Sequence, residues 1–178
     1  VLIANHRGHS SNDVYDASLL IKEKGFSLGL QMMTGLYKDD DNGAIYTCDE
    51  FIKIKPDFVR IYPTVVLKNT LLEQLYNKGD YKPQSVKDAA KLCSELLNRF
   101  DAANIPVIRL GLHTINDADY VAGPWHSAFG ELCESALVLA KLRQKIEHKG
   151  KYNIYVHPSM HSKTAGHCKS NIIELQQS

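Results

Sequence analysis

Two strand-length apolar runs, each closed by polar and turn-forming residues, constrain the fold of this chain more than any other feature. The first covers residues 28–36 (Leu-Gly-Leu-Gln-Met-Met-Thr-Gly-Leu) and the second covers 58–64 (Phe-Val-Arg-Ile-Tyr-Pro-Thr). Each run follows one helical pattern and precedes another, which is the arrangement of consecutive parallel strands. The carboxyl ends of such strands form one rim, and in barrel folds that rim carries the chemistry.

Helical and strand patterns alternate along the rest of the chain. The spacing of apolar residues and caps predicts helices over 10–24, 41–55, 70–78, 85–103, 127–147 and 162–175, strands over 28–33, 58–62, 107–112 and 152–156, and a loop over 116–124. This alternation is typical of an α/β fold whose mainly parallel sheet has right-handed crossovers. Because four strands are too few for a closed eight-stranded barrel, we expect a half barrel or a small open sheet.

Composition excludes several classes of protein. The chain has 178 residues, 44% of them hydrophobic and 23% charged, which is ordinary for a globular domain. Its net charge of +1 gives no strong field toward nucleic acid or membrane. No apolar run approaches the roughly 20 residues that span a bilayer, so no membrane association is expected. The chain begins at Val1 without an initiator Met, and we expect a fragment of a longer protein.

The cysteines lie far apart in the sequence. They are Cys48, Cys93, Cys133 and Cys168. Without a CxxC or CxxxCxxC spacing, no metal or iron–sulfur site is expected on this chain. Cys93 and Cys133 fall within amphipathic helical patterns and are expected to be buried thiols. Unpaired buried thiols indicate a reducing, cytoplasmic setting.

Polar groups at the two apolar runs are the first candidates for a ligand site. Gln31 lies between apolar neighbours, so its amide either bonds to nearby backbone or faces a ligand. Gly35 permits a positive φ or a close backbone approach, which suits a plain turn as well as a site. Pro63 cannot donate in a ladder, so the second strand must end or bulge there and free backbone groups.

Charged and aromatic residues elsewhere supply further candidates. Arg7 precedes the first helix, where it is either a surface group or a bidentate partner for a carboxylate. Arg60 and Arg109 each lie inside a predicted strand and would need a partner if buried. His126 lies at a helix start and is either a cap or a substrate contact.

Several motifs together resemble those of radical S-adenosylmethionine (radical SAM) enzymes. They are Asn5-His6-Arg7-Gly8-His9, the run 28–36, Arg60-Ile61-Tyr62-Pro63-Thr64 with Lys68-Asn69-Thr70 and Glu73, and the segments 76–83 and 121–132. The subgroup they resemble is the catalytic subunit of Elongator together with bacterial relatives that lack an acetyltransferase domain. The resemblance covers essentially the whole chain, and the Tyr-Pro-Thr segment is its most specific part.

The resemblance implies a fold and two cofactors. The fold would be part of a (β/α) barrel, with residues 1–147 forming its last strands and 148–178 a small C-terminal strand–helix extension. The missing N-terminal half of the same protein would hold a [4Fe–4S] cluster in a CxxxCxxC loop. That cluster would reductively cleave S-adenosylmethionine, and RNA would be the substrate of a tRNA modification.

The resemblance also implies residue roles. Arg7 would meet the methionyl carboxylate, Gln31 would face the cofactor, and the adenosyl pocket would be lined by Gly35, Leu36, Tyr62 and Pro63. Arg109 and His126 are our candidates for substrate contacts.

The chain departs from the family pattern at two points that bear on its activity. Tyr37-Lys38 stands where the subgroup usually has Pro-Gly, and no cluster motif is present. The chain alone is therefore expected not to catalyse, and its open sheet edge is expected to favour self-association. Two other interpretations remain: a non-catalytic α/β binding module, and a barrel enzyme that uses Arg60, Arg109 and His113 on a phosphate. The second lacks a glycine-rich phosphate loop.

Overall fold

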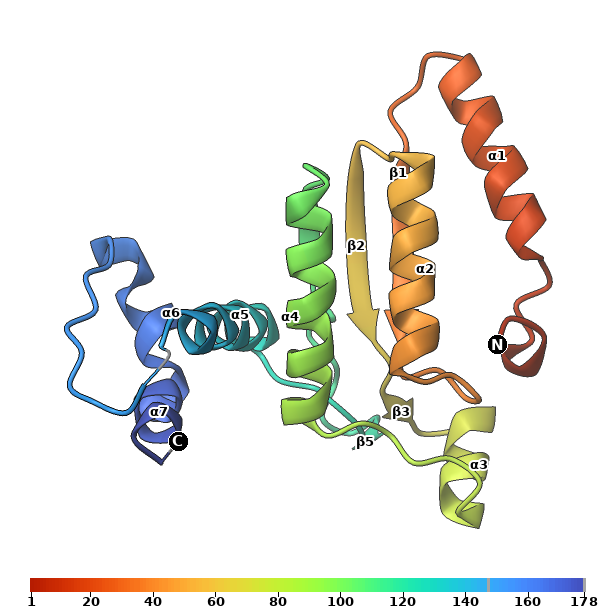
Figure 1. Ribbon diagram of the computed structural model, residues 1–178. Helices are drawn as coiled ribbons and strands as arrows, with labels where there is room; N and C mark the ends of the chain where they lie inside the picture. Colours follow the sequence, from red (N-terminus) through yellow and green to blue (C-terminus); the bar gives the residue numbers. More distant parts are fainter. Residues whose placement is uncertain (147, 178) are drawn as a thin grey trace.

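A parallel sheet of three strands organises the computed structural model, which describes residues 1–146 and 148–177 (Figure 1). The strands are β1 (Gly29–Thr34), β2 (Phe58–Pro63) and β4 (Val107–Leu110), in the order β1-β2-β4. Both pairings are parallel, with one irregularity in register between β2 and β4. The predicted α/β class and parallel sheet are confirmed.

Alternation along the strands gives the sheet one apolar face. Leu30 and Met32 of β1 and Val59 and Ile61 of β2 are buried, whereas the residues between them are partly or fully exposed. Successive side chains of a strand point to opposite faces. One face therefore packs into the core and the other carries the polar residues of both strands.

Helices α2 (Asp41–Ile54) and α4 (Val86–Ala102) cover the apolar face (Figure 1). Each starts at a capping side chain: the Asp40 carboxylate accepts from the Gly43 amide, and the Ser85 hydroxyl accepts from the Asp88 amide. These caps satisfy amides that have no partner within the helix. The helices bury Phe51, Leu96 and Phe100 against the strands.

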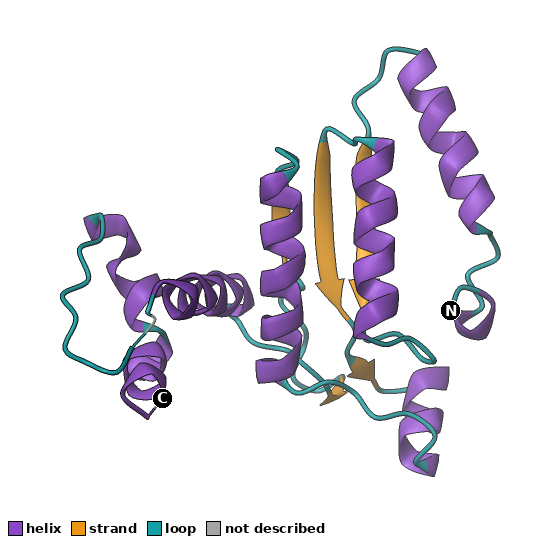
Figure 2. Ribbon diagram, in the orientation of Figure 1, coloured by secondary structure: helices purple, strands orange, loops and turns teal. Residues whose placement is uncertain are grey.

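Smaller elements gather at the carboxyl ends of the strands (Figure 2). They are the antiparallel pair β3 (Val66–Leu67) and β5 (Tyr120–Ala122), and helix α3 (Leu71–Lys78). The two-strand pair was not predicted, and β5 lies within the expected loop over 116–124. Strands this short carry too few residues for a periodic pattern to be read.

The two ends of the chain lie on opposite sides of the sheet (Figure 1). A 3₁₀ turn (Ile3–Asn5) and helix α1 (Ser11–Glu23) precede β1, and α1 begins with a capping box between Ser10 and Asp13. Helix α5 (Phe129–Lys145) packs on α4 and is followed by α6 (His161–Ala165) and α7 (Ser170–Gln177). Two further 3₁₀ turns cover Pro158–Met160 and His167–Lys169.

Two predictions for the C-terminal region are wrong. No strand forms over 152–156, because the segment has no neighbouring strand to pair with; Tyr155 in it is 92% exposed. The helix predicted over 162–175 is interrupted by positive φ angles at Gly166 (80°) and Cys168 (51°). The described part of the extension is therefore a loop over 148–157 followed by short helical segments. The predicted domain boundary and the predicted end of the helix before it fall on residue 147, outside the described residues.

The interruption at Gly166 allows a close approach. A Cβ atom there would lie 2.7 Å from the amide nitrogen of Asn171. The buried Asn171 side chain donates to the carbonyl and hydroxyl oxygens of Ser135, at 2.9 and 3.0 Å. This amide ties α7 to α5. Across residues 1–146 and 148–177, no helix is both long and apolar enough to cross a membrane.

Burial of Phe100 leads to a prediction about stability. The Phe100 side chain is 0% exposed in the core between α4 and the sheet. We expect Phe100→Ala to lower the free energy of unfolding by about 3–5 kcal/mol, because it removes buried apolar area and leaves a cavity. The matched control is Phe26→Ala, since Phe26 is 70% exposed. Equal urea midpoints for the two variants would contradict this core assignment.

Candidate functional site

The face of the sheet opposite α2 and α4, called the open face below, presents a row of polar side chains. Gln31 of β1 is in register with Arg60 of β2, and Arg60 is in register with Arg109 of β4. Gln31 and Arg60 are exposed and Arg109 is partly buried. Gln31 is thus not a core glutamine, and its amide has no hydrogen-bond partner in the part of the chain that the structure describes.

Arg7 joins this face at the carboxyl half of β1. Its Nη2 lies 2.7 Å from Sδ of Met33, whose partner in register is Tyr62. The Asn5 amide also donates to the Tyr37 carbonyl at 2.9 Å, so the N-terminal turn is attached to the loop after β1. Arg7, Gln31 and Tyr62 are therefore brought to one side of the sheet from three separate parts of the sequence.

Gly35 forms the turn at the end of β1, and two residues from the segment before α4 fix it. Gly35 has φ +70°, and a Cβ there would lie 2.9 Å from Oε1 of Gln84. The Tyr81 hydroxyl donates to the Gly35 carbonyl at 2.7 Å. Burial raises the pKa of Tyr81 to about 12, so its hydroxyl keeps its proton at neutral pH. Only a residue that accepts positive φ and lacks a side chain fits this turn without strain.

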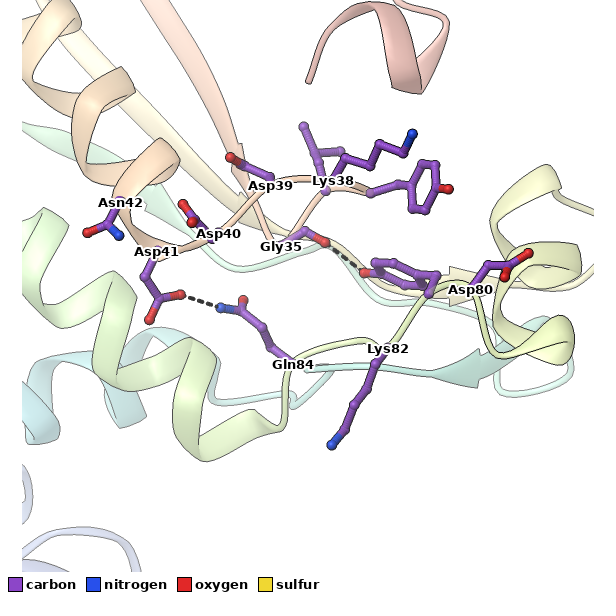
Figure 3. Close-up of a pocket in the computed structure, with 12 residues that line it drawn as sticks. Gly35, Lys38, Asp39, Asp40, Asp41, Asn42, Asp80, Lys82 and Gln84 are labelled. Atoms are coloured by element: carbon purple, nitrogen blue, oxygen red, sulfur yellow. Dashed lines mark hydrogen bonds between the residues drawn. The ribbon is translucent and has the colours of Figure 1, made fainter.

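A cavity of about 610 Å³ opens beside this turn (Figure 3). Its walls are the turn residues 35–42 and residues 80–82 and 84. Gln84 donates from Nε2 to Asp41 at 3.1 Å, while its Oε1 is buried without a hydrogen-bond partner among the described residues. Burial raises the pKa of Asp39 at the same wall. Gly35 and Leu36 therefore line a cavity.

The other two residues predicted for the adenosyl pocket lie on opposite faces of β2. Pro63 is fully buried and in register with the buried Thr34, so its ring lies on the helix-covered side. Tyr62 precedes it and is partly exposed on the open face. Neither residue lines the cavity beside Gly35.

His126 lies in a different environment. Its Nδ1 accepts from the Ala128 amide at 3.1 Å, which closes a turn just before α5. Its ring meets the His167 ring edge to face, with centroids 5.7 Å apart. A second cavity, about 590 Å³ in volume, lies between α5 and the C-terminal segments 159–169. The contacts of His126 thus link it to the C-terminal helices and not to Arg7.

Sequence reasoning missed the supporting residues of the site. Tyr81, Gln84 and Asn5 each hold part of the rim, yet none was assigned a role. Asn5 and Tyr81 lie within two of the motifs that resemble the radical SAM family, Asn5–His9 and the segment 76–83. This was the one sequence feature that could have drawn attention to them. Their contacts span 46 and 32 residues of sequence for Tyr81 to Gly35 and Asn5 to Tyr37, so no local pattern could reveal them.

Three of the four cysteines lie in the core. Cys93 and Cys133 are fully buried, as predicted, as is Cys48, whereas Cys168 is exposed. Burial raises the pKa of the Cys48 thiol to about 12, and the contact with Cys93 together with burial raises that of Cys133. In the described part of the chain no three His, Cys, Asp or Glu side chains are grouped to hold a metal ion. These residues do not fit an iron–sulfur cluster.

Comparison with known protein families finds a match for the central part of the chain. Residues 56–138, from the start of β2 into α5, match the family described as the radical SAM C-terminal domain. This match covers 83 of the 178 residues, so the central part of the chain resembles a radical SAM C-terminal domain. The chain resembles the C-terminal half of an Elongator-like radical SAM protein, as the sequence motifs indicated.

Individual proteins agree with this family. The tRNA uridine(34) acetyltransferase of Methanocaldococcus jannaschii is 32% identical over 91 residues, 49% of this chain and 17% of that protein. Elongator complex protein 3 of Homo sapiens is 32% identical over 95 residues, 52% of this chain and 17% of that protein.

A solved structure extends the likeness to most of the fold. It is the archaeal Elp3 of Methanocaldococcus infernus with an N-terminal deletion, and it superposes with a TM-score of 0.62 at 25% identity. The superposition covers 81% of this chain and 33% of that one. The matched region is therefore a minor part of every relative named here.

The contact between Tyr81 and Gly35 leads to a prediction. Tyr81→Phe removes the hydroxyl donor and leaves the Gly35 carbonyl unpaired, so we expect the free energy of unfolding to fall by about 1 kcal/mol. Tyr76→Phe is the matched control, because Tyr76 is exposed on α3 and its hydroxyl has no hydrogen bond among the described residues. Urea unfolding of both variants measures the difference, and an unchanged midpoint for Tyr81→Phe would exclude a supporting role.

Proposed function

We propose that this chain is the C-terminal part of a radical SAM enzyme of the Elongator type, which reductively cleaves S-adenosylmethionine and acts in tRNA modification. The observation that carries the proposal is the open face, which carries Arg7, Gln31 and Tyr62, with Tyr62 inside the region that matches the radical SAM C-terminal domain. In a barrel this face would be the interior, and the carboxyl rim is where barrel enzymes hold their ligands.

The residues of this chain would hold the cofactor in place. Arg7 is exposed, and the one described contact of its guanidinium is the Met33 thioether sulfur, so it can bind a carboxylate. We assign it to the methionyl carboxylate of S-adenosylmethionine. Gln31 would donate or accept through its amide, and Gly35, Leu36 and Tyr62 would border the adenosyl group. Pro63 would contribute only its backbone carbonyl, because its ring is buried.

The [4Fe–4S] cluster would be held outside this chain. When bound, such a cluster supplies the electron for cleavage of the cofactor. The described residues offer no ligand set for it, so the proposed partner is an N-terminal half of the same protein that carries the cysteine loop. That half would also pair with the free edge of β1, which otherwise invites self-association.

The proposed substrate is RNA. Support comes from the names of the relatives, one of which is a tRNA uridine(34) acetyltransferase. Arg109 and His126 are the proposed substrate contacts. A tRNA substrate and free buried thiols both suit a cytoplasmic protein.

Cofactor cleavage by the full-length protein tests this function. After anaerobic reconstitution with iron and sulfide, we expect a bound cluster, and reduction in the presence of S-adenosylmethionine should release 5′-deoxyadenosine. Absorption spectra report the cluster, and chromatography reports the product. A full-length protein that binds no cluster and releases no product would leave a non-catalytic α/β binding module as the function.

Arg7 provides a second test. Arg7→Ala in the full-length protein should weaken S-adenosylmethionine binding by about 1.5–3 kcal/mol, because a charge-assisted hydrogen bond is lost. Arg143→Ala is the control, since Arg143 pairs with Glu174 on the far C-terminal helices. Calorimetry of both variants measures the affinity. An Arg7→Ala protein with the parent affinity would rule out the carboxylate role.

A further inference from the structure

Two arginines stand side by side on the open face. Arg60 of β2 and Arg109 of β4 are partners in register, and neighbouring parallel strands lie about 4.8 Å apart. The neighbours of Arg60 in β2, Val59 and Ile61, are both 0% exposed on the other face, so the Arg60 side chain projects from the open face. The fold thus places the two arginines next to each other on neighbouring strands.

Within residues 1–146 and 148–177, neither arginine forms an ion pair with an acidic side chain. The ion pairs within the described residues use other basic groups, namely Lys53, Arg99, Arg143 and Lys163. Nε of Arg109 is buried and makes no hydrogen bond within the part of the chain that the structure describes. Like charges opposite each other destabilise a sheet, and a buried donor without an acceptor adds to that cost. A bound anion would remove both penalties.

The chemistry of the pair favours a phosphate group. A guanidinium is a planar fork that matches carboxylate and phosphate oxygens. A planar carboxylate fills one fork, whereas a tetrahedral phosphate directs its oxygens toward two forks at once. Gln31, in register with Arg60, extends the row with an amide toward β1, where Arg7 contacts Met33. A phosphate at the arginine pair would therefore lie next to the proposed cofactor position and not within it.

We propose that Arg60 and Arg109 form a binding site for a backbone phosphate of an RNA strand. The proposal rests on the proposed function for the choice of RNA, and it deepens that function by naming the group of the substrate that the sheet holds. It also gives the two strand arginines one shared role, in place of separate unpaired charges.

Binding of a short oligouridylate, labelled with a fluorophore, tests the proposal. Fluorescence anisotropy with the intact protein across a range of KCl concentrations gives the affinity and its salt dependence. We expect Arg60→Gln and Arg109→Gln each to weaken binding about tenfold, and each to reduce the salt slope by about 1, because one phosphate contact is lost. Arg60 is exposed and its removal relieves like-charge repulsion, so Arg60→Gln should not lower the urea midpoint and keeps the test valid if Arg109→Gln unfolds.

Lys141→Gln is the control, since Lys141 is exposed on α5 and has no ion pair among the described residues. It should leave affinity and slope as they are. Uridine, which carries no phosphate, should fail to compete, whereas inorganic phosphate should compete weakly and show that the site reads the phosphate itself.

Three outcomes would overturn the proposal: no binding by the parent chain, an equal loss in Lys141→Gln and Arg60→Gln, or competition by uridine as strong as that by oligouridylate. The assay for release of 5′-deoxyadenosine contains no RNA, so its result does not depend on the phosphate site. Failure of the phosphate site is therefore distinguishable from failure of the proposed function.

Discussion

The pairing of β1 with β2 is the interaction on which the rest of the structure depends. It is an unbroken parallel ladder from Gly29 and Phe58 to Thr34 and Pro63. Because both strands keep the same register, their apolar residues face α2 and α4 together, and their polar residues face the other way together. A shift of one residue would place Arg60 in the core and Val59 in water. The register of β1 and β2 therefore determines both the core and the candidate site.

Much of this arrangement could be predicted from sequence, and the reason lies in periodicity. The helix over 85–103 has capping and apolar signals that agree, and α4 covers nearly the same residues. The strands at 58–62 and 107–112 were predicted from apolar runs closed by turn residues, and both exist with slightly different ends. Pro63 closes β2, as its missing amide proton requires.

The errors arise where a local pattern has no partner in space. Residues 152–156 are rich in aromatic and β-branched side chains, yet a strand needs a neighbour, and no other strand lies beside this segment in the described structure. Conversely, β3 and β5 are too short to show a pattern and form because the chain brings them together. The role of Tyr81 could not be predicted for the same reason, because it depends on a hydrogen bond to the Gly35 carbonyl, 46 residues away in sequence.

The family match begins at residue 56, between α2 and β2. That point is a boundary of sequence similarity only. β1 and α2 lie before it, and they supply the partner of β2 and much of the cover over Val59 and Ile61. The Asp57 carboxylate even accepts the Leu28 amide across it, at 2.6 Å. A piece that folds cooperatively therefore has to include Leu28, β1 and α2. A chain cut at the family boundary would expose a bare strand edge and half of an apolar layer, and would be prone to aggregate.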